Sequence, residues 1–270
     1  MKAYLASWQA AGVPADFLAS APTAIDEEPV PSDGFRATAL LDVRGLRIVG
    51  STRTDAPVLA TGISLSVARG EIIGLVGVAG SGTREIALAI AGRLPGPAVI
   101  AAGSILIDGQ EVVGASRRAL HRLRETKISL VSPGVPSGLS PYSTVGRRPA
   151  RTLRRNRGLP RLDQAALLRV AITAAVSSRP DILILDEPER AFDAAGETAA
   201  LDLCRRLRQE FGLSIIVVSH DLCRAAATCD RVAVVEEGRV VEHGSAAEIV
   251  ASPQHPYTRS LLEAARTARL

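Results

Sequence analysis

A glycine-rich stretch follows an apolar segment and opens a helical pattern, which is the arrangement of a phosphate-binding loop. Glycines let the backbone curl with its N–H groups inward, and the N-terminus of the following helix adds positive dipole. The usual pattern, G-x-x-x-x-G-K-[ST], then places a lysine on the terminal phosphates and a hydroxyl on Mg²⁺. Thr83 and Arg84 occupy those two places, so the glycine-rich backbone loop is kept and its lysine is missing. The residues predicted to bind a nucleotide are Gly77, Gly80, Ser81, Gly82, Thr83 and Arg84.

Two acidic side chains and an imidazole close later apolar segments. Asp186 and Glu187 follow the segment Ile182–Leu185, and His220 closes the next one. A carboxylate at a strand end beside a phosphate loop suits Mg²⁺, so Asp186 is predicted to hold the metal together with Thr83. Glu187 is the candidate base for an attacking water, and His220 the candidate contact to the terminal phosphate. Each is weak evidence alone, because an Asp-Glu-Pro sequence is often only a helix entry and a lone His is often structural.

The elements that position these residues are predicted from apolar periodicity. Alternating apolar residues from Ala39 onward predict antiparallel strands before a central buried strand, Ile72–Val76. The second half alternates strands with helices, which predicts an α/β fold with a mainly parallel sheet covered on both faces. Ligands bind at the carboxyl ends of such strands, so Gly77, Asp186 and His220 are expected to share one crevice. Further predicted strands are Gly103–Gly109, Ile128–Val131, Ile182–Leu185, Ser214–Val218 and Val232–Val235, and predicted helices are Thr83 to about Gly92, Arg117–Glu125, Gln164–Val176, Gly196–Phe211 and Leu222–Thr228.

Composition limits the class of protein. The 270 residues are 47% hydrophobic but only 3% aromatic, so the core is expected to be Val, Ile, Leu and Ala. Apolar runs are strand-sized, well short of the roughly 18 residues of a membrane span, and the N-terminus lacks the features of a signal peptide. Three cysteines without metal-ligand spacing fit a reducing compartment, so a cytoplasmic location is expected. Residues 1–38, broken by prolines, are predicted to be a poorly ordered extension.

The basic charge does not by itself identify a partner. The net charge is +4, and seven arginines gather between Arg147 and Arg161. Aromatic residues that would stack on bases are absent from that segment, which favours a solvated face over a nucleic-acid arm. Nucleic acid is therefore not expected as a partner.

The combined motifs resemble the ATP-binding cassette (ABC) family over about Leu40 to Ala265. Ile182–Asp186 resembles its Walker B strand, Asp193 its D-loop aspartate and His220 its switch histidine. The C-terminal segments Gly238–Gly244 and Ser252–Leu262 resemble the tail of the subfamily that powers oligopeptide, dipeptide and nickel importers.

This resemblance implies a P-loop NTPase (RecA-like) core with an antiparallel β-subdomain and an α-helical subdomain, and ATP and Mg²⁺ as cofactors. It also implies a peripheral subunit on the inner face of the cell membrane. Such a subunit pairs head to tail with a second cassette beneath permease subunits, which a solute-binding protein supplies.

Several departures from the family pattern lie on its contact surfaces. An ungapped comparison places Leu162–Ala166 on the signature sequence, where Asp163 would meet the partner's nucleotide, and Pro133 on the Q-loop glutamine. The 15 residues of Arg147–Arg161 replace several helical turns, so the helical subdomain, about residues 142–178, is expected to be shortened. Asp163 and Asp193 are the predicted dimer-interface residues. The cassette is predicted to span residues 39–265, followed by a tail at 266–270.

The leading interpretation is an importer cassette that carries ATP weakly or not at all and forms the degenerate half of an asymmetric pair. Similar loops, ending Gly-x-Arg-Thr or Gly-x-Gln-Arg, occur in second cassettes of sugar and nucleoside importers. With the lysine, glutamine and signature missing, hydrolysis is expected to be weak or absent. The alternative is a pseudo-ATPase scaffold that kept the fold without transport. A third reading, a soluble cassette ATPase of DNA repair or translation, is disfavoured by the importer-type tail.

Overall fold

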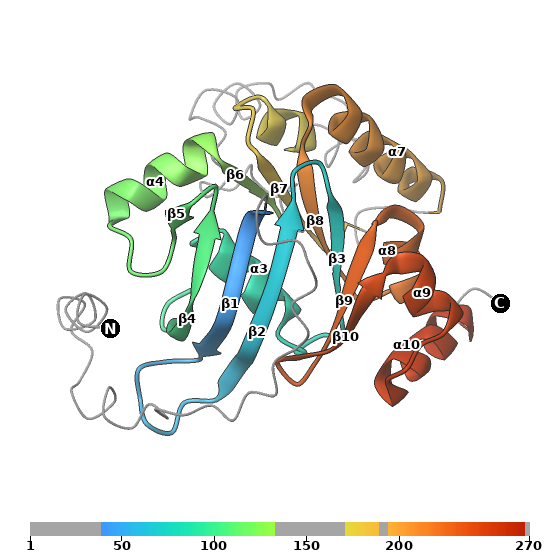
Figure 1. Ribbon diagram of the computed structural model, residues 1–270, viewed down its shortest axis with the longest axis horizontal. Coiled ribbons are helices and arrows are strands. Elements are labelled where there is room, and N and C mark those ends of the chain that lie inside the picture. Colours follow the sequence, from blue (N-terminus) through green and yellow to red (C-terminus); the bar gives the residue numbers. More distant parts are fainter. Residues whose placement is uncertain (1–38, 133–170, 189–193, 268–270) are drawn as a thin grey trace, which may run out of the picture.

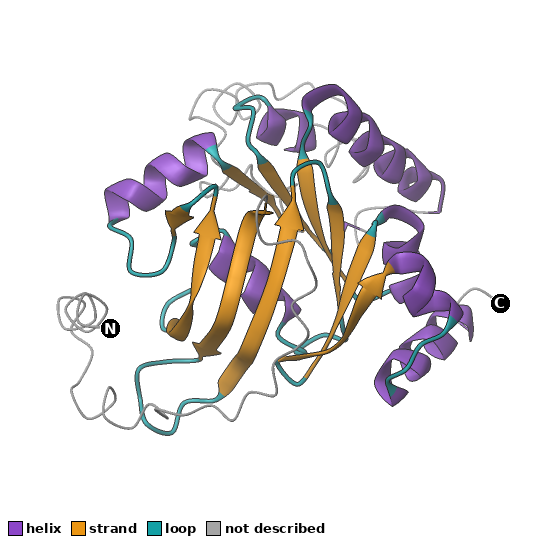
Figure 2. Cartoon of the chain, viewed as in Figure 1, coloured by secondary structure: helices purple, strands orange, loops and turns teal. Residues whose placement is uncertain are grey.

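The computed structural model consists of two β-sheets with helices packed between and around them (Figures 1 and 2). The structure describes residues 39–132, 171–188 and 194–267. The expected N-terminal extension, most of the predicted helical subdomain and residues 268–270 therefore lie outside the described residues.

An antiparallel sheet forms the first layer. Its order is β2-β1-β4-β5, and Val43 of the central strand pairs with Leu65 on one side and Ile105 on the other. Apolar residues alternate along these strands because one face packs on the core. This layer is the predicted antiparallel subdomain. Its strands are β1 (Ala39–Val49), β2 (Val58–Ala68), β4 (Val99–Ile107) and β5 (Gln110–Glu111).

The second sheet has six strands in the order β10-β9-β3-β8-β7-β6. Neighbouring strands from β9 to β6 pair in parallel, and only β10 at the edge is antiparallel. Every residue of β3, β7 and β8 is buried, as expected of strands covered on both faces. The predicted α/β class is confirmed. The bounds are β3 (Ile72–Val76), β6 (Ile128–Val131), β7 (Ile182–Asp186), β8 (Ser214–Ser219), β9 (Arg231–Glu236) and β10 (Arg239–Ser245).

The helices agree with the periodicity where the sequence predicted them, and two more follow at the C-terminus. Residues 171–176 are helical and match the end of the predicted helix Gln164–Val176. None of the helices in the described residues has the length and apolar character needed to span a membrane. The helices are α3 (Thr83–Ile90), α4 (Arg117–Thr126), α7 (Ala194–Phe211), α8 (Leu222–Thr228), α9 (Ala246–Ala251) and α10 (Pro256–Thr267).

The parallel sheet separates two apolar clusters. Along β3, Ile73 and Leu75 join the cluster shared with the antiparallel sheet and α3, whereas Ile72 and Val76 join the cluster beneath α8 and α10. Helix α3 contacts β2 on one side and β7 and β8 on the other. The helix that begins at the glycine-rich loop is thus held between the two sheets, which fixes the position of the loop.

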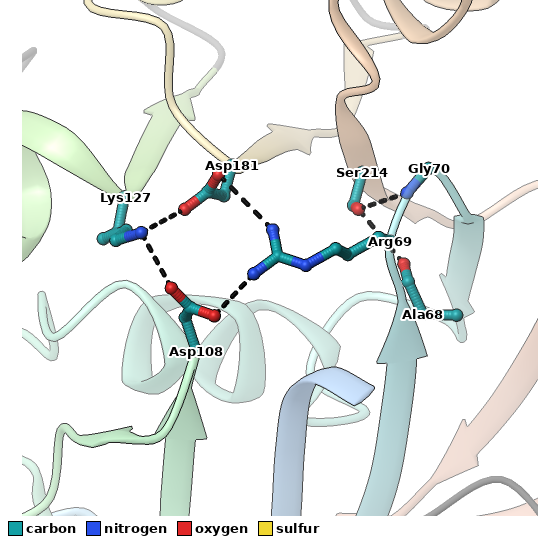
Figure 3. Close-up of polar contacts among 7 residues, drawn as sticks. All are labelled: Ala68, Arg69, Gly70, Asp108, Lys127, Asp181 and Ser214. Atoms are coloured by element: carbon teal, nitrogen blue, oxygen red, sulfur yellow. Dashed lines mark hydrogen bonds and ion pairs between the residues drawn. The ribbon is translucent and has the colours of Figure 1, made fainter. Parts of the chain in front are cut away.

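A polar network also joins the two sheets (Figure 3). The Nζ of Lys127 lies 2.8 Å from carboxylate oxygens of both Asp108, after β4, and Asp181, before β7. Arg69, after β2, contacts the same two carboxylates. Beside it, the Ser214 hydroxyl donates to the Ala68 carbonyl at 3.1 Å. Hydrogen bonds to Asp108 and Asp181 raise the pKa of Lys127, and the bond from Lys127 lowers the pKa of Asp108.

Candidate nucleotide-binding site

The glycine-rich loop connects β3 to α3 and is shaped by close backbone packing. A Cβ on Gly77 would lie 2.4 Å from both the Ser81 Oγ and the Val235 carbonyl oxygen. Gly82, the N-cap of α3, has φ of +97°, and a Cβ there would lie 2.4 Å from the Leu59 carbonyl oxygen. Both positions therefore require glycine, one for space and the other for space and conformation.

Hydrogen bonds within the loop and from two distant segments hold its shape. The amide of Ser81 donates to the Val78 carbonyl at 3.0 Å, and the Ser81 carbonyl accepts from the Gly238 amide at 2.8 Å. The Tyr257 hydroxyl, at the start of α10, accepts from the Val78 amide at 3.1 Å. The segment Ser252–Leu262, which includes Tyr257, thus contacts the loop directly. The sequence carried no signal for this contact, because it depends on how the C-terminal helix packs.

The segment Ser252–Leu262 is anchored by the carboxylate of Glu242. Glu242 of β10 accepts from the backbone amides of Gln254 at 2.8 Å and His255 at 2.9 Å. Burial opposes ionisation of Glu242, but these two backbone hydrogen bonds lower its pKa below the ordinary value. The segment that carries Tyr257 therefore begins from a defined anchor.

The ends of three neighbouring strands bring the remaining predicted residues to one edge of the sheet. Val76 lies opposite Ser219, and Asp186 lies opposite Val218. The amide of Gly77 donates to the Ser219 carbonyl at 3.2 Å, one residue before His220. Gly77, Asp186 and the exposed His220 thus occur where β3, β7 and β8 end.

Glu187 has an unusual backbone conformation. Its φ is +46°, in the left-handed region that non-glycine residues seldom adopt, and its amide donates to the Val218 carbonyl at 2.9 Å. Such a conformation costs on the order of 1–3 kcal/mol, and this structure also shows it at Asp108, Arg179 and Glu237. The strained turn directs the chain away from β7 just after Asp186.

Arg84 contacts the carboxylate that was predicted to hold Mg²⁺. The Nε of Arg84 lies 3.4 Å from the Asp186 Oδ2, and the Asp186 side chain is only 2% exposed whereas that of Arg84 is 50% exposed. Thr83, in the place of the usual lysine, is buried, and its hydroxyl lies 3.4 Å from the Ser81 Oγ. Of the two residues that depart from the loop pattern, Arg84 thus contacts Asp186, whereas Thr83 is buried beside Ser81.

This arrangement does not fit a magnesium ion. The place of the hydroxyl ligand holds a cationic side chain, and that side chain is paired with the buried carboxylate. Mg²⁺ requires oxygen ligands at about 2.0–2.1 Å in near-octahedral geometry, and a guanidinium offers only donors and a like charge.

The predicted interface residues cannot be placed. Asp163, Asp193 and the Q-loop position Pro133 lie outside the described residues, so their roles stay predictions. The predicted catalytic roles of Glu187 and His220 likewise stay predictions.

Comparisons with known proteins identify the family. The profile described as "ABC transporter" matches residues 60–190. The oligopeptide transport ATP-binding protein OppD of Escherichia coli is 30% identical over 89% of this chain and 80% of its own length. This chain belongs to the ABC transporter family. A putative peptide import ATP-binding protein of Brucella ovis is 34% identical over 84% of this chain and 78% of its own length, so the likeness lies with the peptide-importer branch.

Solved ABC cassettes share the fold. CbiO1 of Clostridium perfringens, part of an ABC transporter complex, superposes with a TM-score of 0.65 at 24% identity, covering 86% of this chain and all of its own. A dimeric ATP-binding cassette bound to ADP and Pi gives a TM-score of 0.63 at 18% identity, covering 76% of this chain and 98% of its own. The architecture is that of a P-loop NTPase cassette.

Proposed function

We propose that this chain is the ATP-binding subunit of a peptide-type ABC importer and serves as the degenerate half of an asymmetric cassette pair. Its relatives among oligopeptide and peptide import proteins support the importer class. The contact of Arg84 with Asp186 carries the degenerate part, because it puts a cation where the family pattern has a metal-binding hydroxyl. ATP is the proposed ligand of the loop.

The loop is suited to bind phosphate even without its lysine. The N-terminus of α3 has no side-chain cap, so its backbone N–H groups and helix dipole face the site. Ser81 and Thr83 add hydroxyls. Losing a charge-assisted hydrogen bond of about 1.5–3 kcal/mol weakens binding roughly 10–100-fold, which leaves binding possible at cellular ATP levels.

The proposed partners are a second, more complete cassette and the permease subunits, with the solute-binding protein acting indirectly. In a head-to-tail pair the altered loop impairs this chain's own site, and the altered signature at 162–166 impairs its partner's. The proposed location is the inner face of the membrane, reached through the permease. The substrate class, peptides, is inferred from the relatives' names.

Affinity purification of the tagged full-length chain from detergent-solubilised membranes of its native cell tests this assignment. We expect two permease subunits and a second cassette to co-purify. Their absence, together with recovery of an unrelated partner, would overturn the importer assignment and favour the scaffold alternative. An untagged culture processed in parallel is the control for adventitious binding.

A further inference from the structure

We propose that Arg84 replaces the divalent cation of this site, so that the loop binds the polyphosphate of a nucleotide without Mg²⁺. The inference rests on the proposed function only in taking a nucleotide to be the ligand. It does not depend on the chain's partners or on transport.

The position of Arg84 is the first support. It is the second residue of α3 and takes the place of the hydroxyl residue in the loop pattern. Its side chain reaches Asp186 at the end of β7, with 3.4 Å between the Nε and the Oδ2. A cation at this position lies between the loop and the acidic strand end, where the metal would otherwise bridge protein and phosphate.

Charge and exposure are the second support. Asp186 is 2% exposed, so its carboxylate needs a nearby positive charge to offset the cost of burial. The Arg84 side chain is half exposed, so it extends from that carboxylate toward solvent. A guanidinium has five donors and binds phosphate well, and the Nε contact leaves donors for a ligand. One side chain can thus neutralise Asp186 and contact phosphate oxygens.

A nucleotide titration of the purified full-length protein tests the proposal. ATP and ADP binding is measured by calorimetry in millimolar Mg²⁺ and again in excess EDTA. For the wild type we expect the dissociation constants to agree within about 2-fold, since the counterion is built in. A loss of about 10-fold or more in EDTA would overturn the proposal, as would the absence of binding in both buffers.

Variants at position 84 test whether Arg84 is the cause of the Mg²⁺-independent binding. Arg84→Ser restores the hydroxyl of the usual pattern, so we expect binding in EDTA to weaken by about 10-fold or more and to become Mg²⁺-dependent. Arg84→Lys keeps the charge and is expected to stay independent of Mg²⁺. Arg118→Ser, an exposed change of equal charge on α4, is the matched control and should bind like the wild type.

Stability measurements separate a folding defect from a binding defect. Thermal unfolding of each variant, followed by circular dichroism, shows whether loss of binding reflects loss of fold. The wild-type comparison between the two buffers needs no substitution, so it decides the question even if Arg84→Ser is unstable.

Co-purification with permeases despite Mg²⁺-dependent binding would overturn this inference and leave the proposed function standing.

Discussion

Replacing Gly82 with alanine is expected to destabilise the protein far more than replacing Gly80. Both residues have a left-handed backbone, with φ of +97° and +85°. A Cβ on Gly80 would meet nothing within 4 Å, whereas one on Gly82 would lie 2.4 Å from the Leu59 carbonyl oxygen of β2. The pair therefore separates conformational strain, which both variants carry, from steric overlap, which only one carries.

The magnitude follows from these two terms. A non-glycine residue in the left-handed region costs about 1–2 kcal/mol, which is the whole effect expected for Gly80→Ala. Overlap with a backbone atom adds about 1–3 kcal/mol, because neither α3 nor the strand can move freely. Gly82→Ala is thus expected to lower the free energy of unfolding by about 2–5 kcal/mol, a large share of the total for a domain.

Urea unfolding followed by circular dichroism measures both variants against the wild type. The slope of the free energy against urea should be unchanged and the midpoint lower, more so for Gly82→Ala. Equal destabilisation of the two variants would refute the claim that the loop is packed against β2. A larger effect at Gly80 would contradict the placement of both glycines.

Three further predictions concern contacts outside the loop's glycines. Tyr257→Phe removes the acceptor of the Val78 amide, so hydrogen exchange at Val78 should accelerate about 2–10-fold. The Ile86 amide, which donates to the Gly82 carbonyl, is the internal control and should exchange at an unchanged rate. Unchanged exchange at Val78 would count against the contact. Lys127→Met should lower the free energy of unfolding in urea by about 1 kcal/mol, because Asp108 and Asp181 lose one of the two cations that they share and keep the other, Arg69. An unaltered urea midpoint would exclude a stabilising role for Lys127. The lowered pKa of Asp108 contributes stability that is present above its unfolded pKa of about 3.9 and is lost as the pH falls through its folded pKa. Asp108→Asn should therefore flatten the acid side of the curve of unfolding free energy against pH. Identical curves for the variant and the wild type would disprove this linkage.

The sheet core was predictable because its signals are local. β3, β6 and α8 have the bounds that the apolar runs indicated, and β7, β8 and β9 differ by one residue at an end or at both ends. β4 begins at Val99, four residues before the predicted strand, because the residues from Val99 to Ala102 are only partly buried and give a weak pattern. β10 and α10 were recognised only through the resemblance to a family tail, and α9 was not predicted, since these short, partly exposed segments lack clear periodicity.

The site was predictable as a set of residues but not as a set of contacts. Parallel strands place their carboxyl ends at one edge, so Gly77, Asp186 and His220 could be expected together. The contact of Arg84 with Asp186 joins segments far apart in the sequence and depends on a side-chain direction. Arg84 was predicted as a phosphate ligand, and its pairing with Asp186 adds a role that no local pattern encodes. The left-handed conformation of Glu187, whose amide donates to the Val218 carbonyl of β8, was likewise not predicted.

ATP turnover by the purified protein in millimolar Mg²⁺ tests the central claim most directly. The wild type and Glu187→Gln are compared under identical conditions, with phosphate release followed over many hours. A degenerate cassette predicts no turnover above that of Glu187→Gln, because the loop lacks its lysine and Arg84 is paired with Asp186, the carboxylate that was predicted to bind the metal. Turnover by the wild type that Glu187→Gln abolishes would contradict it.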